Sequence, residues 1–120
     1  MVSAQCVILV IVHSRIMYIE AKNGDHAGEA WIGRVTFSKT GKRVYYGDQS
    51  FQRHRYPGIE SNHYEITTGD DYWISGAKRT GGDRHHSHPG PVQVDEDVRV
   101  EYWTAIRGQP QRASEADANR

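Results

Sequence analysis

The chain has 120 residues, which is close to the commonest size of one domain and too short for a large multidomain enzyme. Lysine and arginine together number 15, as do aspartate and glutamate, so no overall charge attracts nucleic acid or a membrane surface. The single cysteine excludes an intrachain disulfide, and no apolar run reaches the length of a membrane-spanning helix. These features favour a cytoplasmic protein with no membrane partner.

The first sixteen residues differ in character from the sequence that follows. They contain the apolar run Cys6–Val12, which has no preceding lysine or arginine and no small-residue cleavage site, so it makes a poor signal peptide. Residues 1–16 are therefore interpreted as an added strand or as sequence upstream of the true start, with Met17 as the alternative first residue. We expect residues 17–108 to fold without them.

Short strands separated by glycine-containing turns follow, a pattern typical of a small barrel or meander. Apolar and polar residues alternate from Ala30 to Phe37, as expected when one face of a strand is buried. Gly41 and Gly69 lie in predicted hairpin turns. The predicted strands cover residues 17–20, 30–37, 44–46, 50–53, 63–67, 72–76 and 92–94.

A helix is predicted to begin after Asp95, whose side chain can cap the first turn. Gly108 ends this helix, and residues 109–120 are polar and predicted to be disordered. The expected fold is mainly β: about five strands in a small antiparallel, SH3-like or related β-barrel or meander, closed by one C-terminal helix. The apolar face of the predicted helix comprises Val98, Tyr102, Ala105 and Ile106.

Several motifs between Met17 and Gly108 carry a family resemblance. They are Glu29–Val35, Phe37–Lys42, Val44–Tyr46, Asn62–Tyr64, Thr68–Gly76, Gly82–His85 and Val94–Val98. With these motifs the chain resembles a group of small, uncharacterised bacterial proteins that often carry the label 1-deoxy-D-xylulose-5-phosphate synthase.

That label does not fit the chain. Synthases of that name are large thiamine-diphosphate enzymes, whose cofactor magnesium is held by a motif beginning Gly-Asp-Gly. Here each Gly-Asp pair is followed by another residue, namely His26, Gln49, Asp71 or Arg84. The resemblance therefore implies no activity, no cofactor and no catalytic residues.

The loop motif Asp83-Arg84-His85 is the weak candidate for catalysis. Arg84 could bind an anion and His85 could act as a general acid or base near neutral pH. In the alternative interpretation, Asp83 and Arg84 fix the loop by hydrogen bonds while His85 packs on a tryptophan. We favour this structural role, because the motif lacks the nucleophile and orienting group of a catalytic site.

His86 and His88 are the weak candidates for metal binding. In an extended segment they share one face, and His63, His85 or Asp83 could complete a tetrahedral site. The relatives that the chain resembles keep His85 but have tryptophan and small residues where His86 and His88 stand. Solvated histidines in a polar loop are therefore the favoured interpretation, and we expect neither a metal nor another cofactor.

A basic and aromatic surface is the leading candidate for binding. Residues 34–55 carry six cations and one acid, whereas residues 60–71 carry four acids and no cation. Tyr45 and Tyr46 must point to opposite faces of their strand, so one ring is expected outside the core, and Tyr46 is taken as that ring. The candidate binding cations are Lys39, Lys42, Arg43, Arg53 and Arg55.

The sequence thus favours a small non-enzymatic binding module. Cations that contact phosphates and rings that stack on bases suit a single-stranded nucleic acid, and the same surface suits a protein partner. The alternative from another class is a small hydrolase or transferase centred on Asp83, Arg84 and His85.

Overall fold

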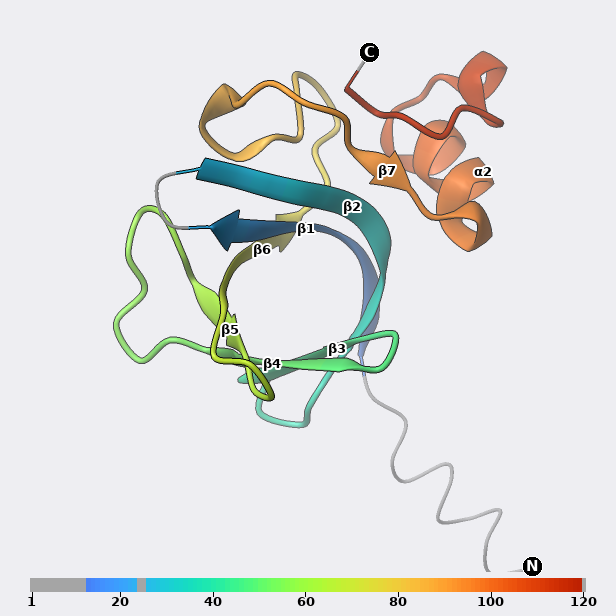
Figure 1. Cartoon of the computed structure of the whole chain (residues 1–120). Coiled ribbons are helices and arrows are strands. Elements are labelled where there is room, and N and C mark those ends of the chain that lie inside the picture. Colours follow the sequence, from blue (N-terminus) through green and yellow to red (C-terminus); the bar gives the residue numbers. More distant parts are fainter. Residues whose placement is uncertain (1–12, 24–25, 120) are drawn as a thin grey trace, which may run out of the picture.

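The computed structural model describes residues 13–23 and 26–119. Six antiparallel strands form a closed barrel, in the order β1-β6-β5-β4-β3-β2, and pairing between β1 and β2 closes it (Figure 1). The small antiparallel barrel predicted from the sequence is confirmed, and each of its six strands overlaps a predicted strand. The strands are β1 (Ser14–Asn23), β2 (His26–Phe37), β3 (Arg43–Tyr46), β4 (Gln49–Arg53), β5 (His63–Glu65) and β6 (Asp71–Gly76).

The predicted C-terminal helix is also confirmed, and it packs beside the barrel (Figure 1). A short strand, β7 (Gln93–Val94), first pairs in parallel with β2 outside the barrel. Three short helical pieces then follow without a break: a 3₁₀ turn, η2 (Glu96–Val98), an α-helical turn, α2 (Arg99–Glu101), and a π-helical turn, η3 (Tyr102–Ile106). Further 3₁₀ turns are η1 (His85–Ser87) and η4 (Pro110–Arg112).

Two cores lie on opposite sides of the β1–β2 hairpin. Alternation in β1 sends Met17 and Ile19 into the barrel, where they join apolar residues of the other strands such as Phe51. Ile16 and Tyr18, which alternate with these residues along β1, point outward and pack under the C-terminal segment. This second core contains Ile16, Tyr18, Ala30, Ile32, Val92, Val94, Val98, Tyr102 and Trp103.

The π-helical turn changes which helical residues are buried. Ala105 belongs to the predicted apolar face but is exposed, whereas Trp103 is fully buried. The backbone N–H of Arg107 bonds to the carbonyl of Tyr102, five residues earlier, so the wider turn rotates the following side chains around the axis. The 3.6-residue period used in the sequence analysis therefore fails at this point.

The C-terminal segment also differs from expectation. The sequence predicts disorder for residues 109–120, but the described part of this segment forms the 3₁₀ turn η4 and then runs antiparallel beside β7. The indole Nε1 of Trp103 donates to the carbonyl of Glu115, and the N–H of Ala118 donates to the carbonyl of Val92. The segment is fixed mainly by backbone groups, which a polar composition does not reveal.

The expected boundary after residue 16 falls inside β1, since the strand begins at Ser14. Ile16 is buried in the second core, and residues 14–16 pair with β2. The remainder of the predicted N-terminal segment lies outside the described residues. Strand β1 could not be delimited from the sequence because the apolar run before it masks the period-2 pattern.

A chain that begins at Met17 is therefore expected to be less stable than one that begins at residue 13. Loss of the Ile16 side chain alone should lower the free energy of unfolding by about 2 kcal/mol, and the lost strand pairing adds to this. Urea denaturation of the two chains measures the difference. Equal midpoints and slopes would mean that residues 13–16 contribute nothing to the barrel.

Candidate functional site

Asp83 joins the loop after β6 to the C-terminal helix. Its side chain is buried and accepts hydrogen bonds from the N–H of Lys78, the hydroxyl of Tyr102 and Nη2 of Arg107. Burial and the hydrogen bond to Asp83 raise the pKa of Tyr102. These bonds occupy the carboxylate, which suits a structural role.

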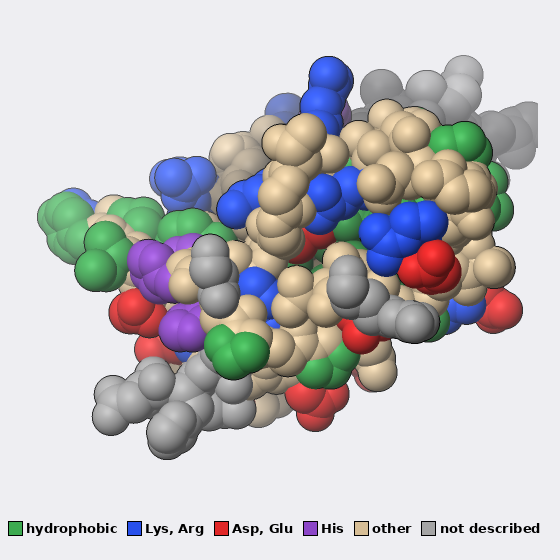
Figure 2. Space-filling model, turned by 90° about the horizontal axis from the view of Figure 1, so that it is seen from above, with side chains coloured by type: hydrophobic (Ala, Val, Ile, Leu, Met, Phe, Trp, Pro, Cys, Tyr) green, Lys and Arg blue, Asp and Glu red, His purple; other side chains and the backbone are tan. Residues whose placement is uncertain are grey.

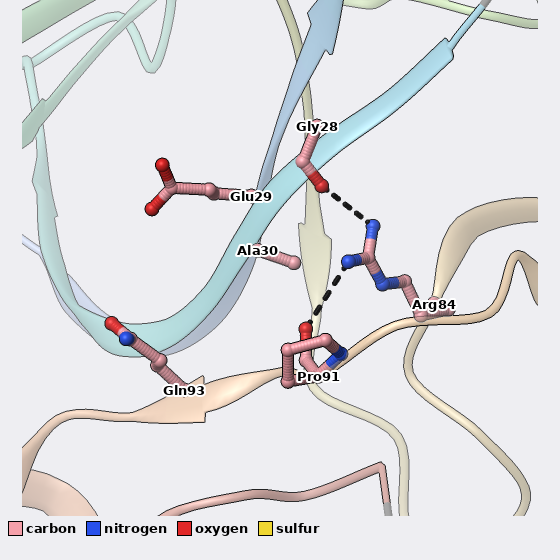
Figure 3. Close-up of a pocket in the computed structure, with 6 residues that line it drawn as sticks. All are labelled: Gly28, Glu29, Ala30, Arg84, Pro91 and Gln93. Atoms are coloured by element: carbon pink, nitrogen blue, oxygen red, sulfur yellow. Dashed lines mark hydrogen bonds between the residues drawn. The ribbon is translucent and has the colours of Figure 1, made fainter.

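Arg84 braces the same loop against β2 (Figure 3). Its Nη1 donates to the carbonyl of Gly28 at 2.8 Å and its Nη2 to the carbonyl of Pro91 at 3.1 Å. The guanidinium lines a cavity of about 240 Å³, and the Glu29 carboxylate at its rim points away from Arg84 in Figure 3. Because both ends of the guanidinium already hold carbonyls, it is poorly placed to clamp a substrate anion.

Beneath this loop lies a buried charged cluster centred on Glu20 of β1. The Glu20 carboxylate is fully buried, accepts the hydroxyl of Tyr18 and lies 2.8 Å from Nζ of Lys22. Arg84 Nη1 is 3.7 Å away, and the N–H of His85 donates to Glu20 Oε1. Burial alone raises the pKa of Glu20, but Lys22, Tyr18 and Arg84 outweigh it and hold the pKa below its usual value.

The sequence analysis missed this cluster. Tyr18, Glu20 and Lys22 alternate with barrel residues and so resemble the solvated face of an edge strand. Tyr18 packs in the second core, and Glu20 contacts Arg84 and His85 of the loop that covers it. No local signal in the sequence marks such a contact between distant segments.

His85 stacks on Trp73, with ring centroids 3.7 Å apart and an interplanar angle of 12°. Packing of His85 on a tryptophan is what the structural interpretation of this motif expects. Burial lowers the pKa of His85 to about 4, and the charges of Lys22 and His86 act in the same direction. The ring is therefore neutral at pH 7, and its buried Nδ1 has no hydrogen-bond partner among the described residues.

The rings of His86 and His88 lie next to each other in an edge-to-face arrangement. Their ring centroids are 6.0 Å apart with nearly perpendicular planes, and His86 Nε2 lies 3.1 Å from the carbonyl oxygen of Ile59. Figure 2 shows histidine side chains gathered beside a hydrophobic projection. The side chain of Ile59, whose carbonyl His86 contacts, is highly exposed. Within residues 13–23 and 26–119, no three His, Cys, Asp or Glu side chains have an arrangement that could hold a metal ion.

Antiparallel pairing gathers three of the predicted cations at one end of the barrel. The end of β4 meets the start of β3, where the N–H of Arg53 donates to the carbonyl of Lys42 at 2.8 Å. A hollow of about 570 Å³ opens here, and we call it the basic pocket. Its lining residues are Lys42, Gln52, Arg53, His54 and Arg55.

The other two predicted cations flank the basic pocket. Arg43 lies on the outer face of the barrel, where its Nε donates to Gln52 Oε1 at 3.3 Å. Lys39 is exposed in the hairpin between β2 and β3. Over the described parts of the chain, no ion pair involves any of Lys39, Lys42, Arg43, Arg53 and Arg55.

Tyr46 is not the exposed ring that the sequence analysis takes it to be. It is partly buried against the barrel core, and its hydroxyl donates to Asp95 Oδ2, so Asp95 binds Tyr46 instead of capping the helix. A side chain at Gly33 would overlap the Tyr46 ring, which explains the glycine there. The exposed ring is Tyr45, on the same outer face as Arg43 and Tyr64.

The chain matches no family model, no curated protein and no solved structure. The resemblance to small bacterial proteins therefore stays a prediction. In the described part of the chain, every helix is too short or too polar to cross a membrane.

Proposed function

We propose that this chain is a non-enzymatic module that binds single-stranded nucleic acid at the basic end of its barrel. The observation that carries the proposal is the basic pocket, which brings Lys42, Arg53 and Arg55 together from two segments. Cations without acidic partners in the described structure remain available to contact phosphates. The proposal thus extends the binding surface expected from the sequence and chooses one partner class.

The outer face of the barrel supplies rings beside these cations. Strand register sets Arg43 opposite Gln52 and Gln52 opposite Tyr64, so the three share one row across β3, β4 and β5. Tyr45 stands one row away on the same face and is exposed. Stacking of bases on such rings, with cations on the backbone, is how small barrels bind single strands.

The charge distribution supports a local rather than a global attraction. Asp48 lies in the turn after β3, and Asp70 lies in the turn before β6. Both turns are at the end of the barrel opposite Lys42 and Arg53. Asp71 reaches toward the basic pocket and contacts His54 Nε2 at 3.1 Å. We therefore expect modest affinity that depends strongly on salt.

The alternative functions have less support. A hydrolase or transferase centred on Asp83, Arg84 and His85 would use groups that are already bonded within the loop or stacked on Trp73. A protein partner at the basic pocket would need to be acidic, because nothing in the lining is strongly apolar. Failure of every nucleic-acid ligand would favour that partner.

Binding of a short labelled single-stranded oligonucleotide, followed by fluorescence anisotropy at several salt concentrations, tests the proposal. Three phosphate contacts predict that log affinity against log salt has a slope of roughly −2. Changing Lys42 and Arg53 together to alanine should make the slope shallower by about 1.4. Lys78→Ala, which removes an exposed cation outside the pocket, should leave the slope nearly unchanged.

The same assay separates the two neighbouring tyrosines. Tyr45→Ala should weaken binding by roughly 1–3 kcal/mol with little change in slope, because a stacking ring carries no charge. Tyr46→Phe keeps the partly buried ring and removes only its bond to Asp95, so affinity should hold. An absence of binding at low salt would exclude the proposed function.

A further inference from the structure

The basic pocket is one of three neighbouring hollows. The second, the hairpin hollow, has a volume of about 410 Å³ and is lined by His13, Arg15, Phe37, Ser38, Lys39, Thr40 and Gly41. The third, the arginine groove, measures about 360 Å³ and lies between the barrel and the C-terminal helix. Its cationic lining residues are Arg15, Arg34 and Arg79.

One hairpin and one shared residue connect these hollows into one path. The hairpin between β2 and β3 contributes Lys39 to the hairpin hollow and Lys42 to the basic pocket. Arg15 lines both the hairpin hollow and the arginine groove. Strand pairing fixes the order, because the N–H of Phe37 donates to the carbonyl of His13 at the start of β1.

The far end of this path keeps free positive charge. Arg34 pairs with Glu101 of the helix at 2.5 Å, and this is the acid that lines the groove. Arg15 and Arg79 are exposed, and neither forms an ion pair with any residue that the structure describes. The guanidinium groups can therefore contact phosphates, which they bind in a bidentate manner.

Rings also occur along the path. Phe37 is half-buried in the hairpin hollow, and the His13 ring lies beside it with centroids 6.0 Å apart. A base that leaves the outer face of the barrel would meet these rings before the backbone reaches the arginine groove. Alternating cations and rings are the pattern expected of a channel for a single strand.

We infer that a bound single strand runs from the basic pocket across the hairpin hollow into the arginine groove, where Arg15 and Arg79 contact its phosphates. This inference rests on the proposed function and adds the route that the bound strand follows and the length of strand that the protein contacts. It places the end of the path at the helix that closes the barrel, with Arg34 and Glu101 as the boundary. A short oligonucleotide would fill only part of the path.

The test compares two labelled oligo(dT) strands of about 4 and about 16 nucleotides, the limits observed for small barrels. A longer strand has more ways to sit on any site, which raises affinity but leaves the salt slope unchanged. The slope is therefore the measurement. With two more phosphates contacted, the longer strand should have a slope about 1.4 steeper than the shorter one.

The variant Arg15→Ala/Arg79→Ala should return the slope of the longer strand to that of the shorter one, whose own slope should not change. Lys78→Ala is the control for the single variant Arg79→Ala, because it removes a charge from the adjacent exposed position outside the groove. Equal slopes for the two strands, or equal effects of the double variant on both, would overturn the inference while leaving the proposed function intact. If neither strand binds, the proposed function fails first.

Discussion

Replacing Glu20 by alanine is expected to lower the free energy of unfolding by about 3–5 kcal/mol. The Glu20 carboxylate is fully buried, and Lys22 beside it is almost so. Removing the carboxylate leaves two cations, Lys22 and Arg84, without their shared anion, and it removes the acceptor of the Tyr18 hydroxyl. An uncompensated buried charge costs far more than a lost surface pair.

Two further variants identify the cause of this loss. Glu20→Gln keeps an acceptor for Tyr18 and removes only the charge. Its free energy of unfolding should therefore lie between those of the wild type and Glu20→Ala. Glu29→Ala removes an exposed carboxylate from the neighbouring strand and should change stability by less than about 0.5 kcal/mol. Urea denaturation at pH 7 measures all three, and a Glu20→Ala protein as stable as wild type would refute the role assigned to the cluster.

The second expected result is a loss of stability in mild acid. Burial, with the charges of Arg53 and His54, lowers the pKa of His63 to about 4, and His85 has a similar value. When the chain unfolds, the pKa of each ring returns toward the usual value of about 6.5. The unfolded state therefore binds more protons in this pH range. Stability is therefore fully present above pH 6.5 and falls as the pH decreases toward 4.

For His63 alone the expected loss between pH 7 and pH 4 is about 3 kcal/mol. Glu20 acts in the same direction at still lower pH, because its folded pKa lies below the usual value and its protonation removes the ion pairs. His63→Gln should flatten the decrease above pH 4. A wild-type profile that is flat from pH 7 to pH 4 would contradict both assignments.

Local patterns were sufficient to predict much of the fold. Alternation from Ala30 to Phe37 and the turns at Gly41 and Gly69 correctly indicated antiparallel strands, because these features act over a few residues. The tail beyond Gly108 was not predictable in this way. Its backbone bonds to Val92 and Trp103 join segments that are distant in sequence, and its side chains give no hydrophobic signal.

The candidate site shows the same division. Lys42 and Arg53 were singled out because they belong to one basic stretch, and their pairing across β3 and β4 then brought them together. Arg15 and Arg79 lie outside that stretch, and only the folded chain reveals that both line the arginine groove and that Arg15 also lines the hairpin hollow. The parity rule correctly required one exposed ring at positions 45 and 46, but only the packing of Gly33 decides which.

The β1–β2 hairpin has a consequence for how the molecule comes apart. One face of this hairpin lines the barrel and the other supports the C-terminal segment, so each core depends on the same two strands. Detaching the C-terminal segment would expose Tyr18, while opening the barrel would remove the wall on which that segment rests. We therefore expect the two cores to unfold as one cooperative unit, and we expect the slowest-exchanging amide hydrogens in the strands between them.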